Sequence, residues 1–133
     1  MTKPQLFHSL TYADADLAMG FLEALGFTRV LVVPDGSDPL KVAHAEYRWR
    51  DTGGVMFGSV RDDNPHASAD MVGRAKCYLV VETDAEVDDA YDRVTQAGAR
   101  SVEAPEDQPY GGRSCTVADH EGNQWSVGSY AGA

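Results

Sequence analysis

The sequence predicts an α+β fold of two βαβββ modules, whose curled mixed sheets form a cupped cleft and carry their helices on the convex side. Three observations predict it. Strand-like and helix-like segments occur twice in the same order, the two expected helix caps lie 70 positions apart, and a polar segment, 61–74, separates the halves. The 133 residues suffice for one domain, with modules at about 1–60 and 75–130.

Two segments have the start and stop signals of amphipathic helices. The first is expected to begin after Asp14 as N-cap and to end at Gly26. The second is expected to be capped by Asp84 and to end at Gly98. Acidic residues fill both first turns, where the helix dipole stabilises negative charge. The apolar stripes expected to be buried are Leu17, Ala18, Phe21, Leu22 and Leu25, and Val87, Ala90, Tyr91, Val94 and Ala97.

One strand-like segment precedes each expected helix, and three follow it. These segments alternate apolar and polar residues between Gly, Asp and Pro breaks. The last two are joined through DHEGNQW, 119–125, where Gly122 and Asn123 suit a hairpin turn. The expected strands are 5–12, 27–34, 41–49, 53–60, 76–83, 100–105, 113–120 and 123–130.

Charge and composition narrow the classes of function. The net charge is −10, from 21 acidic against 11 basic residues, which argues against nucleic-acid binding and would favour a cationic ligand. No apolar run reaches the roughly 18 residues of a membrane helix, and the first residues, MTKPQLF, lack the features of a secretory signal. Cys77 and Cys115 form no CxxC, which predicts a reduced, cytoplasmic protein.

The sequence resembles the vicinal oxygen chelate superfamily of glyoxalases, bleomycin-resistance proteins and extradiol dioxygenases. The resemblance rests on DADLAMGFLEALGF in the first module, HAEYRW in its third strand and YGGRSCTVADHEGNQWSVGSY near the end. HAE before an aromatic residue, and D-x-EGN-x-W-S, are most similar to a glyoxalase-like subgroup in which several members lack a metal. The resemblance implies a homodimer with two equivalent clefts. Because the fold hosts many chemistries, the activity must be argued from the site.

The resemblance places the four ligand positions of metal-using relatives on Phe7, Glu46, Cys77 and Ser126 of this chain. Phe7 cannot bind a metal and Ser126 is a poor ligand, whereas a catalytic divalent ion needs at least three protein ligands. Adjacent strand residues face opposite sides, so Phe7 in the cleft puts His8 on the helix side.

His44 leaves a metal site open as an alternative. His44 and Glu46 lie two positions apart on one expected strand and therefore share a face with Arg48. His44, Glu46 and Cys77 are the alternative set of three metal ligands. Otherwise Glu46 pairs with His44 or Arg48 in a hydrogen-bonded polar wall.

Other expected ligand contacts lie near the mouth and floor of the cleft. Tyr110 and Arg113 belong to a segment that, by the resemblance, edges the pocket. Phe57 or its neighbour Met56 is expected to supply an apolar surface, and the two glycines before them leave the register open. The same alternation directs three aromatic residues toward the helices: Tyr47, Trp49 and Trp125.

Two functions follow from these residues. The first is metal-independent binding of a small organic ligand without a cofactor, as in relatives that sequester bleomycin, mitomycin or peptide antibiotics; the ligand would be an aromatic or cationic antibiotic. The alternative is a metal-dependent glyoxalase-like lyase or isomerase, with Glu46 as ligand and base. A metal-free enzyme with Glu46 as general base is a third reading. The expected ligand-binding residues are Phe7, His44, Glu46, Arg48, Phe57, Cys77, Tyr110, Arg113 and Ser126.

Overall fold

The computed structural model describes residues 3–133 and confirms the α+β class and the tandem βαβββ modules. The first module contains β1 (Leu6–Tyr12), α1 (Ala15–Leu25), β2 (Thr28–Pro34), β3 (Val42–Trp49) and β4 (Gly53–Ser59). The second contains β5 (Lys76–Val80), α2 (Asp84–Gln96), β6 (Arg100–Asp107), β7 (Arg113–Ala118) and β8 (Gln124–Gly128). Two 3₁₀ turns, η1 (Pro65–Ala67) and η2 (Ala69–Met71), lie between the modules.

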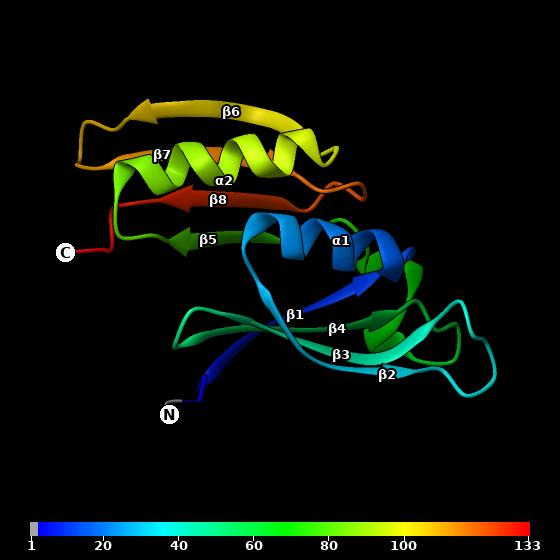
Figure 1. Ribbon diagram of the computed structural model, residues 1–133. Helices are drawn as coiled ribbons and strands as arrows, with labels where there is room; N and C mark the ends of the chain where they lie inside the picture. The colour runs from blue at the N-terminus through cyan, green and yellow to red at the C-terminus, as the bar shows by residue number, and fades with distance from the viewer. Residues whose placement is uncertain (1–2) are drawn as a thin grey trace.

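Each module folds into one mixed sheet of four strands. The strand orders are β1-β4-β3-β2 and β5-β8-β7-β6. In each sheet the first strand pairs in parallel with the last, and the other pairs are antiparallel. The two sheets lie one above the other in Figure 1, with α2 against the upper sheet and α1 between the halves. By these strand orders, β1 and β5 each lie at one edge of their sheet, and the two edges face each other in Figure 1.

The helix ends follow the expected signals in the first module but not in the second. The Asp14 carboxylate accepts a hydrogen bond from Leu17 N at 3.1 Å, and Gly26 ends α1 with φ of 128°. The N-cap of α2 is Thr83, whose hydroxyl accepts from Glu86 N, so the expectation of Asp84 was wrong by one residue. Threonine and aspartate are both favoured N-cap residues, so the two adjacent candidates could not be separated by pattern alone.

The buried helix stripes also differ from the expectation at their ends. Leu17 is 56 % exposed, because in the first turn of α1 the buried positions are Ala15 and Ala18. In α2, Tyr91 is half-buried and Ala97 is the exposed C-cap. The middle of each stripe is buried as predicted, which is where the helix lies closest to its sheet.

A single hydrophobic core passes through both modules. Phe27 packs against Trp49 of β3 and Trp125 of β8, with ring centroids 5.2 and 5.7 Å apart. Trp125, from the second module, also packs against Phe21 of α1. Burial of these rings stabilises the pair of modules together, since each aromatic side chain contributes a large apolar area.

The turn after β7 is the polar joint between the modules. The Asp119 carboxylate is buried and accepts hydrogen bonds from Tyr12 Oη at 2.8 Å and from Trp125 Nε1 at 3.3 Å. It also accepts from Glu121 N, Asn123 N and Asn123 Nδ2, each at 3.0 Å. Five donors thus converge on one carboxylate, and one of them comes from β1 of the other module.

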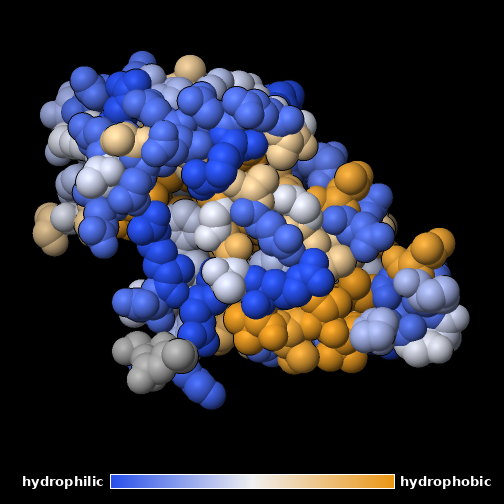
Figure 2. All heavy atoms as spheres, in the orientation of Figure 1, coloured by the Kyte–Doolittle hydropathy of each residue, from blue (hydrophilic) through white to orange (hydrophobic). Residues whose placement is uncertain are grey.

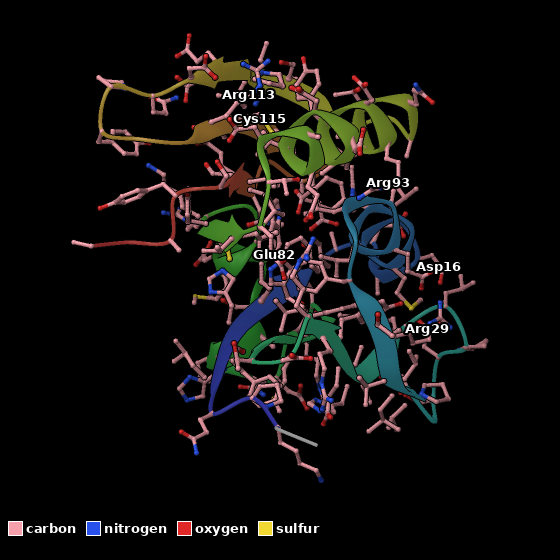
Figure 3. All side chains as sticks on the ribbon, turned by 60° about the vertical axis from the view of Figure 1, so that its left-hand side comes forward. Asp16, Arg29, Glu82, Arg93, Arg113 and Cys115 are labelled. Carbon is pink, nitrogen blue, oxygen red and sulfur yellow. The ribbon has the colours of Figure 1, made fainter. Side chains whose placement is uncertain are left out.

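Further hydrogen bonds connect the modules around this joint. The Glu121 carboxylate accepts from Ala13 N and Asp14 N, both at 2.7 Å, where negative charge suits the start of α1. At the other end of α1, Arg93 of α2 donates to two terminal carbonyls, at 2.9 and 3.1 Å, and lies beside that end in Figure 3. Arg50 pairs with Glu86 at 2.8 Å, so the β3–β4 hairpin is held to α2.

Candidate functional site

The open face of the first sheet carries the expected polar wall. The register of β3 with β4 places Glu46 opposite Met56, away from the core. His44 Nε2 lies 2.8 Å from Glu46 Oε2, so these two side chains pair with each other. Arg48 is half-buried on the same face of β3. Neighbouring β2 adds Leu31 opposite Glu46, so the face is partly apolar.

The first strand has the parity that the sequence predicted. Phe7 pairs with Gly54 on the open face, whereas His8 pairs with Val55 on the helix side. The His8 ring meets Trp125 edge-on at 6.1 Å between centroids. Burial lowers the pKa of His8, and its Nε2 has no hydrogen-bond partner among the described residues. His8 is therefore held as a neutral imidazole against the core.

Phe57 does not contribute to the open face. It is 3 % exposed and packs between the rings of Tyr12 and Tyr47, at 5.4 and 5.7 Å. Met56 takes the outward position instead, because β4 is in register with Glu46 at that residue. The expectation of Phe57 as a ligand contact is corrected accordingly.

In β5 the parity is opposite to that expected, whereas in β8 Ser126 and Trp125 lie on the expected faces. Cys77 pairs with the buried Trp125 and faces the helix side, whereas Tyr78 pairs with Ser126 on the open face. Ser126 Oγ lies 2.7 Å from Thr116 Oγ1, within the row of hydroxyls on that face. The expected equivalence of Phe7 and Cys77 rested on caps 70 residues apart. With Thr83 as the cap the offset is odd, which moves every side chain of β5 to the other face.

Tyr110 and Arg113 lie away from the expected cleft. Arg113 is on the helix side of β7, where its guanidinium donates to Asp88 of α2 at 3.0 Å and to Asp107 at 3.2 Å. These carboxylates raise the pKa of Arg113, and Figure 3 shows it beside α2. Tyr110 is exposed and meets Tyr130 edge-on at 5.1 Å. Both residues stabilise the end of the second sheet.

The residues present do not fit the metal site of metal-using relatives. Phe7 and Tyr78 occupy the open face of the two first strands, and neither ring binds a divalent ion. His44 and Glu46 have no third ligand, because Cys77 belongs to the other sheet and faces its helix side. Among residues 3–133 no three His, Cys, Asp or Glu side chains converge.

A cleft lies between the modules. It has a volume of about 750 Å³, within the range of small-molecule sites, and lies between the first strands β1 and β5 under the β3–β4 hairpin. We call it the inter-module cleft. We call the side lined by helix-side residues such as His8 and Leu79 its floor, and the side lined by the open-face residues Phe7 and Tyr78 its mouth. The aromatic residues that line it are Phe7, His8, Phe27, Trp49 and Tyr78, and charged residues at its rim are Arg50, Asp51, Lys76 and Glu82.

Two of these rings lie across bare glycine backbone, one in each module. A Cβ atom on Gly54 would stand 2.5 Å from Phe7 Cε1, so the Phe7 ring rests directly on β4. The Tyr78 ring rests on Gly128 of β8 in the same way, and its hydroxyl donates to Tyr130 O at 2.7 Å. Each ring is thus held flat beside the mouth of the inter-module cleft.

Thiol and charged groups in the cleft are arranged for binding rather than for nucleophilic attack. Burial raises the pKa of the Cys77 thiol, which keeps it protonated and weakly nucleophilic. Arg50 stacks over Trp49 at 5.2 Å to the ring centroid and pairs with Glu86. Glu82 lies between the two halves of the molecule in Figure 3. The rim thus carries charges of both signs around an apolar interior.

Only two of the nine expected ligand residues, Phe7 and Cys77, line the inter-module cleft. Trp49 and Tyr78 line it but were not expected as ligand contacts. Trp49 was assigned to the core, which is also correct, because the cleft floor is the core surface. A one-residue shift of the second helix cap would have made Lys76 the counterpart of Phe7 and would have placed Tyr78 on the open face. No local sequence pattern indicates that β1 and β5 lie far enough apart to leave a cleft between them.

Comparison with known proteins gives the following matches. The model of a family described as the glyoxalase/bleomycin resistance protein/dioxygenase superfamily matches residues 6–127. No curated protein matches the chain. No helix among residues 3–133 is long and apolar enough to cross a membrane.

Several solved structures have the same fold. A hypothetical protein, SA1046, from S. aureus superposes with a TM-score of 0.72 at 20 % identity, over 95 % of this chain and 93 % of that one. TioX from Micromonospora sp. ML1 superposes at 0.69 with 27 % identity, over 92 % and 95 %. A glyoxalase-related enzyme from Fulvimarina pelagi superposes at 0.71 with 20 % identity, over 96 % and 86 %.

Proposed function

The chain belongs to the glyoxalase/bleomycin resistance protein/dioxygenase superfamily, and from this we propose that it is a metal-independent protein that binds and sequesters a small aromatic antibiotic. The observation that carries the proposal is the inter-module cleft, whose walls are aromatic and which lacks a converging set of metal ligands. The protein has two free cysteines, Cys77 and Cys115, which suit a cytoplasmic location, where a sequestering protein would meet the drug.

The cleft supports a flat, largely uncharged ligand. Phe7 and Tyr78 offer ring faces at its mouth, and Trp49 offers a third ring in its wall. Each aromatic contact adds about 1 kcal/mol beyond the burial of apolar area. The rim carries two positive and two negative side chains, so local charge does not select an anion or a cation, and the net charge of −10 gives only a long-range bias toward cations.

Titration of metal-free protein tests this function. Protein treated with EDTA is titrated by calorimetry with planar intercalating, bleomycin-type and mitomycin-type antibiotics. At least one is expected to bind with a Kd of about 1 μM or tighter, that is, about −8 kcal/mol. The variant F7A should weaken that binding about tenfold, whereas L40A, which truncates an exposed leucine outside the cleft, should leave it unchanged. Absence of binding to every compound at millimolar concentration would overturn the proposal.

Elemental analysis separates this function from the lyase or isomerase alternative. Protein purified without chelator or metal affinity resin should contain well under one divalent ion per chain. The Glu46 carboxylate, paired with His44 on an open face, would then not be a metal ligand. One tightly bound ion per chain, lost together with turnover of a thiol conjugate after E46Q, would instead establish the metal-dependent enzyme.

We also propose that the protein is a homodimer. The edge strand β2 exposes Val30, Leu31 and Val33, and Figure 2 shows apolar residues gathered over this part of the molecule. An edge strand with exposed apolar side chains is a surface at which another chain can associate. A second copy would cover this patch and the adjoining open face of the first sheet.

Sedimentation tests the dimer with a matched pair of variants. The wild type should sediment at twice the 14.4 kDa chain mass, and L31K should sediment as a folded monomer. L17K, on the exposed side of α1, should remain dimeric. A monomeric wild type at 100 μM would contradict the proposal.

A further inference from the structure

Two unpaired strand edges flank the inter-module cleft. β1 and β5 each stand at the end of their sheet, so each has one side without a neighbouring strand. The two strands face each other in Figures 1 and 3 and diverge toward the start of β1, and residues from both line the cleft. An unpaired edge presents a row of backbone N–H and C=O groups that can pair with another extended chain.

The hydrogen bonds around β5 show which of its backbone groups face the cleft. Ala75 O accepts from Gln124 N, and Val81 N donates to Gly128 O, so these odd-numbered residues are directed at β8. In a parallel pair alternate residues bond to the same neighbour, so Tyr78 and Val80 are directed the other way. A hydrogen bond confirms this direction independently. Trp49 lies in the cleft wall, and its Nε1 donates to Val80 O at 3.1 Å.

The side chains beside this edge suit an extended chain with apolar groups. Tyr78 and Val80 are partly exposed on the open face, whereas Leu79 and Val81 are buried on the helix side. An added strand would place its own side chains alternately on these two sides. On the helix side they would meet Phe27, in the cleft floor. The cleft therefore offers backbone pairing along its edge and apolar contacts above and below it.

We infer that the aromatic ligand of the inter-module cleft also carries a peptide segment, which binds as an added strand on the edge of β5 through the Tyr78 N–H and C=O and the Val80 N–H, beside the Val80 carbonyl that Trp49 already binds. The inference rests on the proposed function and names the chemical class of the ligand. Main-chain hydrogen bonds give affinity in this mode, and pockets for alternate side chains give selectivity. A flat ligand without amide groups would leave the Tyr78 N–H and C=O without partners inside the cleft.

Binding of a designed peptide to the full-length wild type tests the inference. The probe is the blocked peptide acetyl-Val-Phe-Val-Phe-Lys-amide, followed by calorimetry and by tryptophan fluorescence, since Trp49 lines the cleft. Two analogues carry N-methyl groups, one on the first and third residues and the other on the second and fourth. Because successive N–H groups of an extended chain point to opposite sides, only one analogue blocks the row that faces β5. That analogue should bind at least tenfold more weakly, and the other within threefold of the parent.

A protein variant removes one donor from the same edge. V80P deletes the Val80 N–H but keeps the carbonyl that Trp49 binds, and proline is tolerated on an edge strand. V80A is the matched control for loss of the side chain. V80P should weaken the peptide at least fivefold relative to V80A. Thermal unfolding of V80P shows whether this variant retains the fold. If V80P does not fold, the two N-methyl analogues with the wild-type protein test the added strand.

The outcomes distinguish this inference from the function on which it rests. Binding of a planar antibiotic without binding of the peptide overturns the added strand and leaves sequestration intact. Equal binding of both N-methyl analogues also overturns it, because backbone pairing would then be absent. Binding of neither peptide nor antibiotic overturns both. Release of monomers by the peptide would show that a second copy of the chain, not a ligand, occupies the edge.

Discussion

The two modules share a topology but differ in how their first strands meet the inter-module cleft. In β1 the ring beside the mouth is Phe7, and in β5 it is Tyr78, and each lies on a glycine of the last strand of its own sheet. The Phe7 ring is half-buried, whereas the Tyr78 ring is 43 % exposed and is tied down by its hydroxyl. The two modules thus place a ring on the same face of the first strand but at different positions, since Phe7 lies seven residues before Asp14 and Tyr78 lies five before Thr83.

The modules also differ in what their outer surfaces carry. The open face of the first sheet is apolar around the His44–Glu46 pair, with Leu31 and Val33 exposed on β2. In the second module the helix carries the charge, in a series of acidic residues on α2: Asp84, Glu86, Asp88, Asp89 and Asp92. This difference is the reason why the proposed dimer contact is placed on the first module and not on the second.

The connection between the modules is the feature whose loss should cost most. D119N replaces an acceptor that serves five donors, so buried donors lose their partner, and we expect the free energy of unfolding to fall by about 3 kcal/mol. Y12F removes one of these bonds and should cost about 1 kcal/mol. Urea unfolding measures both.

The control for this prediction is D107N. The Asp107 carboxylate is exposed and lies 3.2 Å from the Arg113 guanidinium. An exposed ion pair contributes little, so D107N should change the free energy of unfolding little. Equal midpoints for D119N and D107N would show that the turn after β7 does not join the modules.

Substitution of the glycines beneath the two rings, Gly54 under Phe7 and Gly128 under Tyr78, compares how rigidly each module holds its ring. G54A puts a methyl group against the half-buried Phe7 ring, and overpacking should cost about 1–2 kcal/mol. G128A meets the hydroxyl end of the exposed Tyr78 ring, which can swing outward with loss of its one hydrogen bond to Tyr130 O, so the loss of stability should be smaller. Thermal unfolding of both variants gives the order. A larger loss for G128A would mean that Tyr78, not Phe7, is the rigid wall of the cleft.

A smaller effect is expected from pH at His8. Burial lowers its pKa, so below the usual imidazole pKa of about 6.5 the unfolded chain binds a proton that the folded chain resists. The unfolded state then holds more protons, and this part of the stability is present at neutral pH and decreases as the pH falls through 6.5 toward the lowered value. H8N should remove that part. Stability profiles of wild type and H8N that stay parallel between pH 7.5 and 5 would contradict the burial of a neutral His8.

Much of the fold follows from the sequence, because alternation and caps specify each element locally. The faces of Phe7, His8, Tyr47 and Trp125 were predicted by strand alternation from the ligand positions that the family resemblance implies. Cys77 was placed on the wrong face because Thr83 and Asp84 are both good caps, and a shift of one residue reverses a strand.

The remaining errors come from tertiary structure. Phe57 and Met56 could not be separated, since the register of β4 is fixed by pairing with β1 and β3 and not by its own residues. The inter-module cleft was not predicted, because the separation of β1 from β5 depends on how the shared core packs. Local patterns carry no information on that distance.

Protection of Cys77 tests the central claim most directly. Cys77 lines the inter-module cleft, whereas Cys115 is buried in the second module and serves as the internal control. Burial raises the pKa of Cys77, and raises that of Cys115 to about 11, so both should react slowly with iodoacetamide at pH 8, Cys77 the faster. A saturating ligand identified by the antibiotic or peptide titration should slow alkylation of Cys77 at least tenfold, as followed by mass spectrometry. An unchanged rate at Cys77 with the ligand bound would place the ligand elsewhere on the protein.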